Sequence, residues 1–152
     1  MSRFQSKRPP EAMDAATIEE IVVYNMEKAE RMLVDAKAAL SPETSVNRAY
    51  YVVFYATTAL LATEGKTGRS HSGLRETFGK DFVHPCIVPK ELSTLYGKLE
   101  MRRYQADYGD RIILTDEDAQ ESIAQAQEFL RQIFFVLQRI MPKTFGGKHI
   151  TF

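Results

Sequence analysis

The sequence contains a single cysteine and no excess charge of either sign. Cys86 has no second cysteine with which to form an intrachain disulfide, and no signal peptide precedes the domain. We therefore expect a reducing, cytoplasmic location. Twenty basic and twenty acidic residues cancel, which removes any global attraction to nucleic acid or to a membrane surface. Binding of a polyanion would have to come from a local patch.

Long apolar runs and strand patterns are also scarce. The longest apolar stretch, residues 50–62, is too short and too rich in threonine and tyrosine to span a bilayer. The one run typical of a strand, residues 111–114, is too short to found a sheet. These absences exclude a membrane-spanning protein and leave an all-α domain.

Metal-binding and phosphate-loop motifs are missing too. His71, His84 and His149 are scattered, and the spacing of His84 and Cys86 is not that of a zinc site. We interpret these residues as surface histidines and a buried thiol, and we predict no metal and no other cofactor. The glycine-bearing segment 65–70 lacks the spacing and the preceding strand of a P-loop, although its basic residues could contact a phosphate.

Apolar residues recur at helical spacing in four long segments. Thr115 with Asp118 three residues later is typical of a capping box at the start of the last one. The second segment is apolar on two sides, which is typical of a helix central in a bundle or at a subunit interface. The pattern predicts an all-α, up-and-down bundle of four main helices plus one short extra helix. The expected helices cover residues 17–40, 45–65, 72–78 (the short one), 89–108 and 116–140.

The ends of the chain differ from this pattern. Residues 1–14 are basic and contain two prolines, so we expect a disordered N-terminal arm. Residues 142–152 contain Pro142 and a Gly146-Gly147 pair, which argue against a continued helix and favour an irregular tail. The helical bundle itself is expected to occupy residues 15–141.

Two clusters combine basic and aromatic side chains. In the segment "NRAYYVVFY", residues 47–55, Arg48, Tyr51 and Tyr55 fall on one face of a helix. Arg102 and Arg103 form the second cluster with the aromatic residues that follow them, and Arg103 can pair along the helix with an aspartate, Asp107, four residues later. Such residues can also be amphipathic side chains that pack their stems and leave their polar ends in water. Both interpretations stay open from the residues alone.

Four segments occur in an order that resembles the HEPN domain family: "NRAYYVVFYATTALLATEG", "SHSGLRETFGKDFV", "RRYQADYGD" and "EDAQESIAQAQEFL". The resemblance implies a bundle of four to five helices that is often dimeric. It also implies, for many members, metal-independent ribonuclease activity, and for some a toxin paired with a minimal nucleotidyltransferase antitoxin.

The catalytic signature of that family is an arginine followed, after four to six residues, by a histidine near a dimer cleft. Arg48 matches the arginine, whereas Tyr55 stands where the histidine would be. Metal-free RNA cleavage needs a base, an acid and charge on the phosphorane. Histidine, with a pKa near ~6.5, exchanges protons at neutral pH far better than tyrosine near ~10. Losing the base costs ~10²–10⁴ in rate, unless His71 replaces it.

The leading hypothesis is a homodimeric HEPN domain that binds RNA or a nucleotide and acts with a partner such as a minimal nucleotidyltransferase. One alternative is an active metal-independent ribonuclease toxin that uses Arg48 with Tyr55 or His71. Another is a purely structural interaction module, in which Arg48 forms a buried salt bridge with Asp107. The residues expected to bind RNA or nucleotide are Asn47, Arg48, Tyr51, Tyr55, Arg102 and Arg103.

Overall fold

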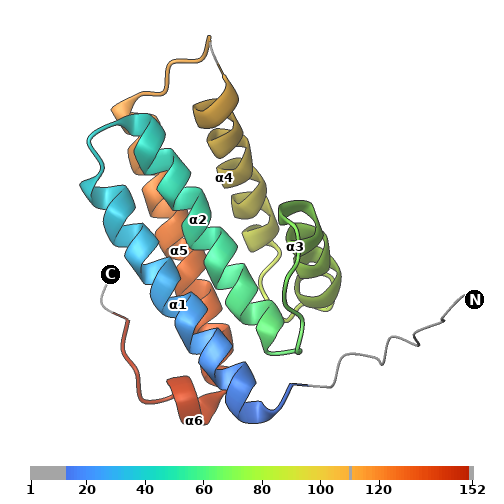
Figure 1. Ribbon diagram of the computed structural model, residues 1–152. Coiled ribbons are helices and arrows are strands. Elements are labelled where there is room, and N and C mark those ends of the chain that lie inside the picture. Colours follow the sequence, from blue (N-terminus) through green and yellow to red (C-terminus); the bar gives the residue numbers. More distant parts are fainter. Residues whose placement is uncertain (1–12, 110, 151–152) are drawn as a thin grey trace, which may run out of the picture.

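The computed structural model describes residues 13–109 and 111–150, and within them the chain forms helices and no strand. The four long helices alternate in direction, so the predicted all-α, up-and-down bundle is confirmed (Figure 1). The predicted N-terminal arm falls almost wholly on residues 1–12, outside the described part of the chain. The elements are α1 (Ala15–Ala38), α2 (Pro42–Ala62), α3 (His71–Phe78), the π-helical turn η1 (Gly79–Val83), α4 (Glu91–Tyr108), α5 (Asp116–Ile140) and α6 (Pro142–Phe145).

The junction between α1 and α2 differs from the prediction. α1 ends at Ala38, and Leu40, the last residue of the helix expected over 17–40, lies outside it and is fully exposed. The cause is the Ser41-Pro42 pair, because Ser41 caps α2 through its side chain and Pro42 occupies the first turn of that helix. Proline disfavours helical geometry in the residue before it and suits the start of a helix. α2 therefore begins three residues earlier than expected.

α2 is the central helix of the bundle. It packs against α1, α4 and α5, and its buried side chains face all three. The two-sided apolar pattern predicted this placement. The part of α2 that no other long helix covers carries half-buried side chains, including Arg48, Tyr51 and Tyr55. This strip is where α2 can meet a ligand.

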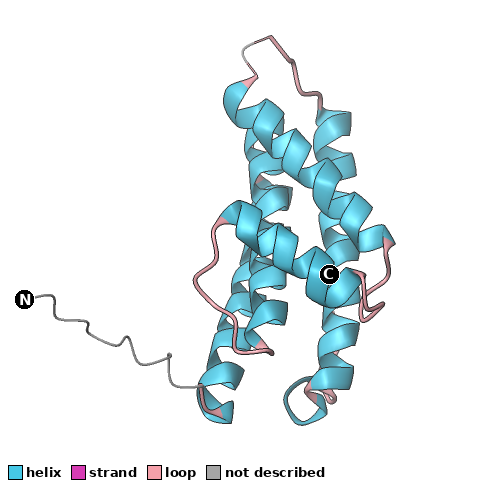
Figure 2. Cartoon of the chain, turned by 90° about the vertical axis from the view of Figure 1, so that its right-hand side faces the viewer, coloured by secondary structure: helices cyan, strands magenta, loops and turns pink. Residues whose placement is uncertain are grey.

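α3 and η1 form a short unit that runs across the long helices instead of along them (Figure 2). The loop leading to α3 contains Gly65 and Gly68, whose φ angles of 73° and 69° are strained for other residues. Leu74, Phe78 and Phe82 are buried and anchor the unit on the core. The predicted helix of residues 72–78 thus exists and begins one residue earlier, at His71.

The last long helix begins as predicted. Thr115 accepts the N–H of Asp118 at 3.1 Å, and the Asp118 carboxylate accepts the N–H of Thr115 at 2.9 Å, which completes a capping box. α5 ends at Ile140, before Pro142, and a one-turn helix that the sequence did not predict follows as α6. Phe145 of α6 is buried against Phe134, with ring centroids 5.9 Å apart.

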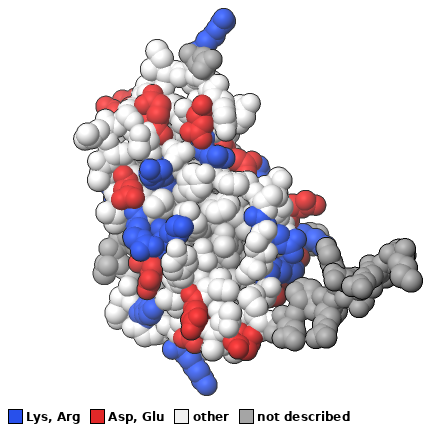
Figure 3. Space-filling view, in the orientation of Figure 1, with Lys and Arg blue, Asp and Glu red and all other residues white. Residues whose placement is uncertain are grey.

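None of the helices in the described ranges is long and apolar enough to cross a membrane. Figure 3 shows acidic and basic side chains interspersed over the face seen in Figure 1. An uncharged area lies over the middle of this face, with basic side chains on either side of it. The positive charge is thus distributed in local groups, as a chain without net charge requires.

We expect Thr115→Ala to lower the free energy of unfolding by about 1 kcal/mol, because the substitution removes the hydroxyl that accepts the Asp118 N–H. Chemical denaturation followed by circular dichroism measures the change. Thr115→Ser keeps the hydroxyl and is the matched control. Equal losses for the alanine and serine variants would show that the cap does not stabilise α5.

Candidate functional site

Arg48 lies at the start of a chain of polar contacts between α2 and α4. Its Nη1 donates to Asn47 Oδ1 at 2.8 Å, and Asn47 Nδ2 donates to Asp107 Oδ1 at 3.3 Å. The partner of Asp107 is Arg103, whose Nε lies 3.2 Å from Asp107 Oδ2. The predicted pairing of Arg103 with Asp107 is therefore confirmed, and the pairing of Arg48 with Asp107 is wrong. Within the described residues Arg48 forms no ion pair, so its charge is not neutralised by a neighbouring carboxylate.

Tyr51 is half-buried at the centre of an aromatic cluster. Its ring centroid lies 5.2 Å from that of Tyr50, 5.7 Å from Phe54 and 6.1 Å from His71, each in an edge-to-face arrangement. The Arg103 guanidinium carbon lies 5.6 Å from the same ring, within the range of a cation–π contact. The cluster joins α2, α3 and α4 and holds the Tyr51 ring in one place.

Tyr55 continues this cluster toward α1. Its ring centroid lies 6.0 Å from that of Tyr51, and the amino group of Lys28 lies 4.5 Å from it. Lys28 also lies 5.7 Å from the ring centroid of Tyr24, which is 55% exposed. Tyr55 therefore has a cation over its ring, and no hydrogen bond joins it to Arg48 in the described part of the chain.

His71, the first residue of α3, packs onto α2. Its ring stacks on Phe54 with centroids 4.5 Å apart, and its Nδ1 lies 2.8 Å from the Tyr50 hydroxyl oxygen. Burial, and then the positive charge of Arg103, lowers the pKa of His71 below its usual value, so the ring is neutral at pH 7. Burial, and then Glu100, raises the pKa of Tyr50 to about 12. The loop after α2 thus delivers His71 to the far side of Tyr51 from Arg48.

A pocket of about 510 Å³ opens beside this histidine. One wall is an ion pair between Arg75 of α3 and Glu100 of α4, with Nη1 and Oε1 2.6 Å apart. Gly97 leaves room for it, because a Cβ at that position would lie 2.9 Å from Arg75 Nη2. We call it the His71 pocket, and it is lined by Tyr50, His71, Ser72, Arg75, Glu76, Glu100, Arg103 and Tyr104.

Arg102 is separated from these residues, although it was predicted to act with them. Its Nη2 lies 3.1 Å from Asp118 Oδ1 and 3.5 Å from Glu121 Oε2, both on α5. Adjacent residues on a helix point about 100° apart, so Arg102 and Arg103 cannot serve the same face. Arg102 joins α4 to α5 instead.

The other candidate side chains of the sequence also lie elsewhere. Lys66 pairs with Asp81 and with Glu64, which closes the loop before α3. Cys86 is exposed, not buried, because it occupies a turn after η1 with a φ angle of 60°. Within residues 13–109 and 111–150, no three histidine, cysteine, aspartate or glutamate side chains lie close enough to hold a metal ion.

Three residues of the pocket were missed from the sequence. Tyr50 was assigned to an apolar stripe of α2, and its hydroxyl gave no signal of a partner 21 positions away. Arg75 and Glu100 are 25 positions apart and belong to different helices. No spacing rule connects such residues, so only the packing of α3 against α4 could reveal them.

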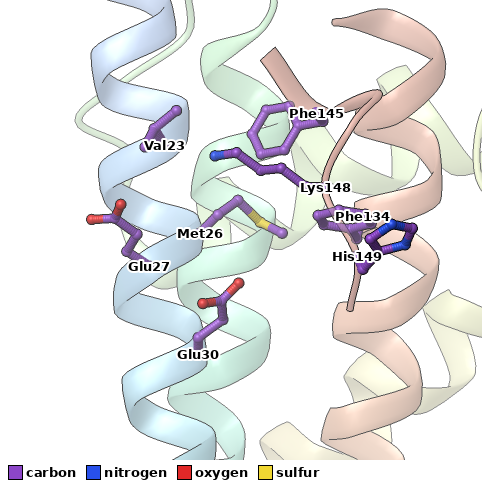
Figure 4. Close-up of a pocket in the computed structure, with 8 residues that line it drawn as sticks. All are labelled: Val23, Met26, Glu27, Glu30, Phe134, Phe145, Lys148 and His149. Atoms are coloured by element: carbon purple, nitrogen blue, oxygen red, sulfur yellow. The ribbon is translucent and has the colours of Figure 1, made fainter. Parts of the chain in front are cut away.

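A second pocket, of about 310 Å³, lies between α1, α5 and the C-terminal segment (Figure 4). Glu27 and Glu30 of α1 lie on one side of it, and Lys148 extends toward them from the C-terminal segment. Burial, and then Glu27, raises the pKa of Glu30. Lys148 Nζ lies 5.3 Å from the ring centroid of Phe145. None of the residues predicted to bind RNA lines this pocket.

Comparison with known proteins finds one domain family and several similar proteins. The HEPN domain model matches residues 22–134. A "UPF0332 protein" of Thermotoga maritima is 36% identical over 118 residues, which cover 76% of this chain and 89% of that protein. "Putative toxin MJ0605" of Methanocaldococcus jannaschii is 32% identical over 64% of this chain and 72% of its own length. A "UPF0332 protein" of Gloeobacter violaceus is 31% identical over 70% of this chain and 87% of its own.

The matched range starts within α1 and ends within α5, and so contains most of these two helices, the whole of α2, α3 and α4, and the polar and aromatic cluster around Tyr51. The four sequence motifs and the match to the family model therefore point to the same family, and together they cover most of the chain. This chain belongs to the HEPN domain family.

Proposed function

We propose that this HEPN domain binds single-stranded RNA on the strip of α2 that carries Arg48, Tyr51 and Tyr55, which we call the tyrosine face. The observation that carries the proposal is a half-buried arginine without a carboxylate partner in the described residues, three positions from a half-buried tyrosine ring. An arginine presents five donors to phosphate oxygens, and a tyrosine presents a flat surface to a base.

Basic side chains lie on both sides of the tyrosine face. Lys28 of α1 lies over the Tyr55 ring, and Arg103 of α4 lies beside Tyr51. Cations on both sides of a row of aromatic rings fit a sugar–phosphate backbone whose bases stack on those rings. A local patch is also what a chain of zero net charge needs if it is to hold a polyanion.

A homodimer and a protein partner complete the proposal. Tyr104 and Tyr108 are 66% and 64% exposed, and their rings lie 5.2 Å apart beside the His71 pocket. Aromatic residues are enriched in protein interfaces, so this pair is a candidate contact between two copies or with a nucleotidyltransferase. Two relatives from Methanocaldococcus jannaschii are named "putative toxins", and the resemblance to the HEPN family implies for some members a toxin paired with a nucleotidyltransferase antitoxin.

Metal-independent RNA cleavage, as a toxin, is the second candidate function. It is favoured by the names of those relatives and by the position of His71, whose ring centroid lies 6.1 Å from that of Tyr51. Arg48 would then stabilise the phosphorane, and Tyr55 or His71 would move a proton. This candidate differs from simple binding in requiring a proton acceptor for the 2′-hydroxyl.

RNA binding can be dissected through its dependence on salt. We expect Arg48→Ala to reduce the slope of log K against log salt by about 0.7, because one phosphate contact to a single strand is lost. Tyr51→Ala should instead weaken binding by about 1–3 kcal/mol without changing the slope, because stacking releases no counterion. Fluorescence anisotropy of a labelled oligouridine, titrated at several salt concentrations, measures both quantities.

Two variants serve as controls for this experiment. Arg131→Ala removes the same charge from α5, where Arg131 contacts Glu128 and Phe135, and should leave the slope unchanged. Tyr51→Phe keeps the ring and should retain most of the affinity. Melting temperatures accompany each titration, because an Arg48→Ala variant that loses binding only by unfolding would support the structural interaction module.

Cleavage is tested with purified protein and RNA in EDTA. If the domain only binds, neither the wild type nor Arg48→Ala yields fragments, since Tyr55 stands where the family signature has a histidine. Fragments from the wild type that disappear in Arg48→Ala would replace the binding function with the ribonuclease function. A His71→Ala variant assayed beside them shows whether that histidine contributes to any cleavage that occurs.

A further inference from the structure

The hydroxyl of Tyr50 is buried and has one partner. The residue is 0% exposed, and within the described residues its hydroxyl bonds only to Nδ1 of His71, at 2.8 Å. A hydrogen bond of this length joins one proton to one lone pair, so either the tyrosine or the imidazole is the donor. The neutral ring carries its proton on one nitrogen, and the bond therefore decides which nitrogen that is.

A buried donor needs an acceptor, and this requirement decides whether Tyr50 or His71 donates the hydrogen bond. If Nδ1–H of His71 donated, the Tyr50 hydroxyl proton would be left without an acceptor in a site that water does not reach. An unmet buried donor costs its full desolvation. If Tyr50 donates, both groups are satisfied and the proton of the neutral ring lies on Nε2. The second assignment leaves no buried donor unmet.

The charges around the pair agree with this assignment. Burial raises the pKa of Tyr50 and so keeps its hydroxyl protonated through the neutral range, and burial together with Arg103 lowers the pKa of His71 and so keeps its ring neutral. The other charged groups that face the pair are Arg75 and Glu100, which neutralise each other across the pocket. Near pH 7 the pair is thus a phenol and a neutral imidazole.

We infer that the His71 pocket binds a phosphate monoester, with the Nε2–H of His71 as a donor to it and Tyr50 as the residue that positions that donor. Nε2 has no protein partner among the described residues, and the ring lines the pocket. Arg103 and Ser72 line the same pocket and supply a cation and a hydroxyl. Glu76, also in the lining, is exposed, and Glu100 is paired with Arg75. Arg103 pairs with Asp107 through Nε, and within the described residues its two Nη groups have no carboxylate partner, so they are the donors that this side of the pocket offers to a phosphate.

The size of the pocket sets the class of ligand. About 510 Å³ lies inside the range of roughly 300–1,000 Å³ that is typical of small-molecule sites, so a nucleoside monophosphate or a phosphorylated RNA end fits it. This inference rests on the proposed function, since it gives RNA held on the tyrosine face a place for its terminal phosphate.

The assignment also restricts what His71 can do in catalysis. With its proton on Nε2, the neutral ring can donate a hydrogen bond to a phosphate or leaving oxygen but cannot accept a proton at that nitrogen. Accepting a proton there would first require Nδ1 to be protonated, which would make Tyr50 the acceptor and leave its own proton unmet. His71 is therefore a donor and not a replacement for the missing base.

The tautomer is measured by ¹⁵N NMR of the histidine rings in the full-length labelled chain, because protonated and unprotonated ring nitrogens have well-separated shifts. The His71 signals are assigned from their loss in His71→Gln. We expect wild-type His71 to show an unprotonated Nδ1 and a protonated Nε2 at neutral pH. Tyr50→Phe should shift this ratio toward the other tautomer.

Tyr96→Phe is the matched control. Tyr96 is also fully buried, and its hydroxyl has no partner in the described part of the chain, so removing that hydroxyl should leave the His71 signals unchanged. A wild-type ring with its proton on Nδ1, or a ratio that Tyr50→Phe does not change, would overturn the role of Tyr50.

Ligand binding is tested with uridine 5′-monophosphate against uridine, and with 5′-phosphorylated against unphosphorylated oligouridine. We expect the phosphate to be required for the mononucleotide and to tighten the oligonucleotide, with a perturbed His71 Nε2 signal in both. His71→Ala should weaken the mononucleotide at least tenfold, whereas His71→Gln, which keeps a side-chain N–H donor, should lose less. Tyr50→Phe should lie between the wild type and His71→Ala.

Three outcomes overturn the inference: equal binding of uridine and its monophosphate, no effect of His71→Ala, or equal losses in the alanine and glutamine variants. Melting temperatures of both His71 variants exclude unfolding as the cause of a loss. If the unphosphorylated oligouridine still binds through Arg48 and Tyr51, the proposed function stands while this pocket assignment fails. Loss of Arg48-dependent binding with a retained mononucleotide site would instead overturn the proposed function alone.

Discussion

The burial of α2 by three other long helices is the constraint on which the rest of this structure depends. A helix covered by α1, α4 and α5 has one narrow strip left for side chains that are not packed between long helices. Arg48, Tyr51 and Tyr55 occupy it because they are spaced by three and four residues. The packing of the bundle therefore produces the tyrosine face as a consequence of the same pattern that builds the core.

The second element of the site is the short unit formed by α3 and η1, which is held by Phe78 and Phe82 in the core. Phe78 packs against Tyr96 of α4 and Phe129 of α5, with ring centroids 5.7 Å from each. These contacts fix where α3 begins, and so they fix where His71 meets α2. An imidazole that stacks on Phe54 and bonds to Tyr50 has its orientation and its proton position set by buried neighbours.

Arg48, Arg102 and Arg103 differ in whether a carboxylate pairs with them. Arg102 pairs with two carboxylates of α5, and Arg103 pairs with Asp107 through Nε, while Arg48 contacts only the amide of its neighbour among the described residues. An arginine that keeps its charge beside a tyrosine ring is suited to a phosphate and a base. The chain belongs to the HEPN family, and two of its relatives are named "putative toxins". Tyr55 stands where the resemblance to that family would place a histidine, so the proposed binding and the alternative cleavage differ in whether that position supplies a proton acceptor.

The sequence by itself determined the all-α class, the number of long helices, the capping box at Thr115 and the central place of α2, because these follow from local propensity and helical periodicity. It also determined that Arg48, Tyr51 and Tyr55 share a face. Boundaries near Leu40 were wrong, since the cap at Ser41 and the proline after it compete with the apolar pattern. The tertiary structure alone decided the partner of Asp107, the turn of Arg102 toward α5, and the bond between Tyr50 and His71. Those contacts join residues far apart in the chain, and only the packing of separate helices can bring such residues within hydrogen-bonding distance.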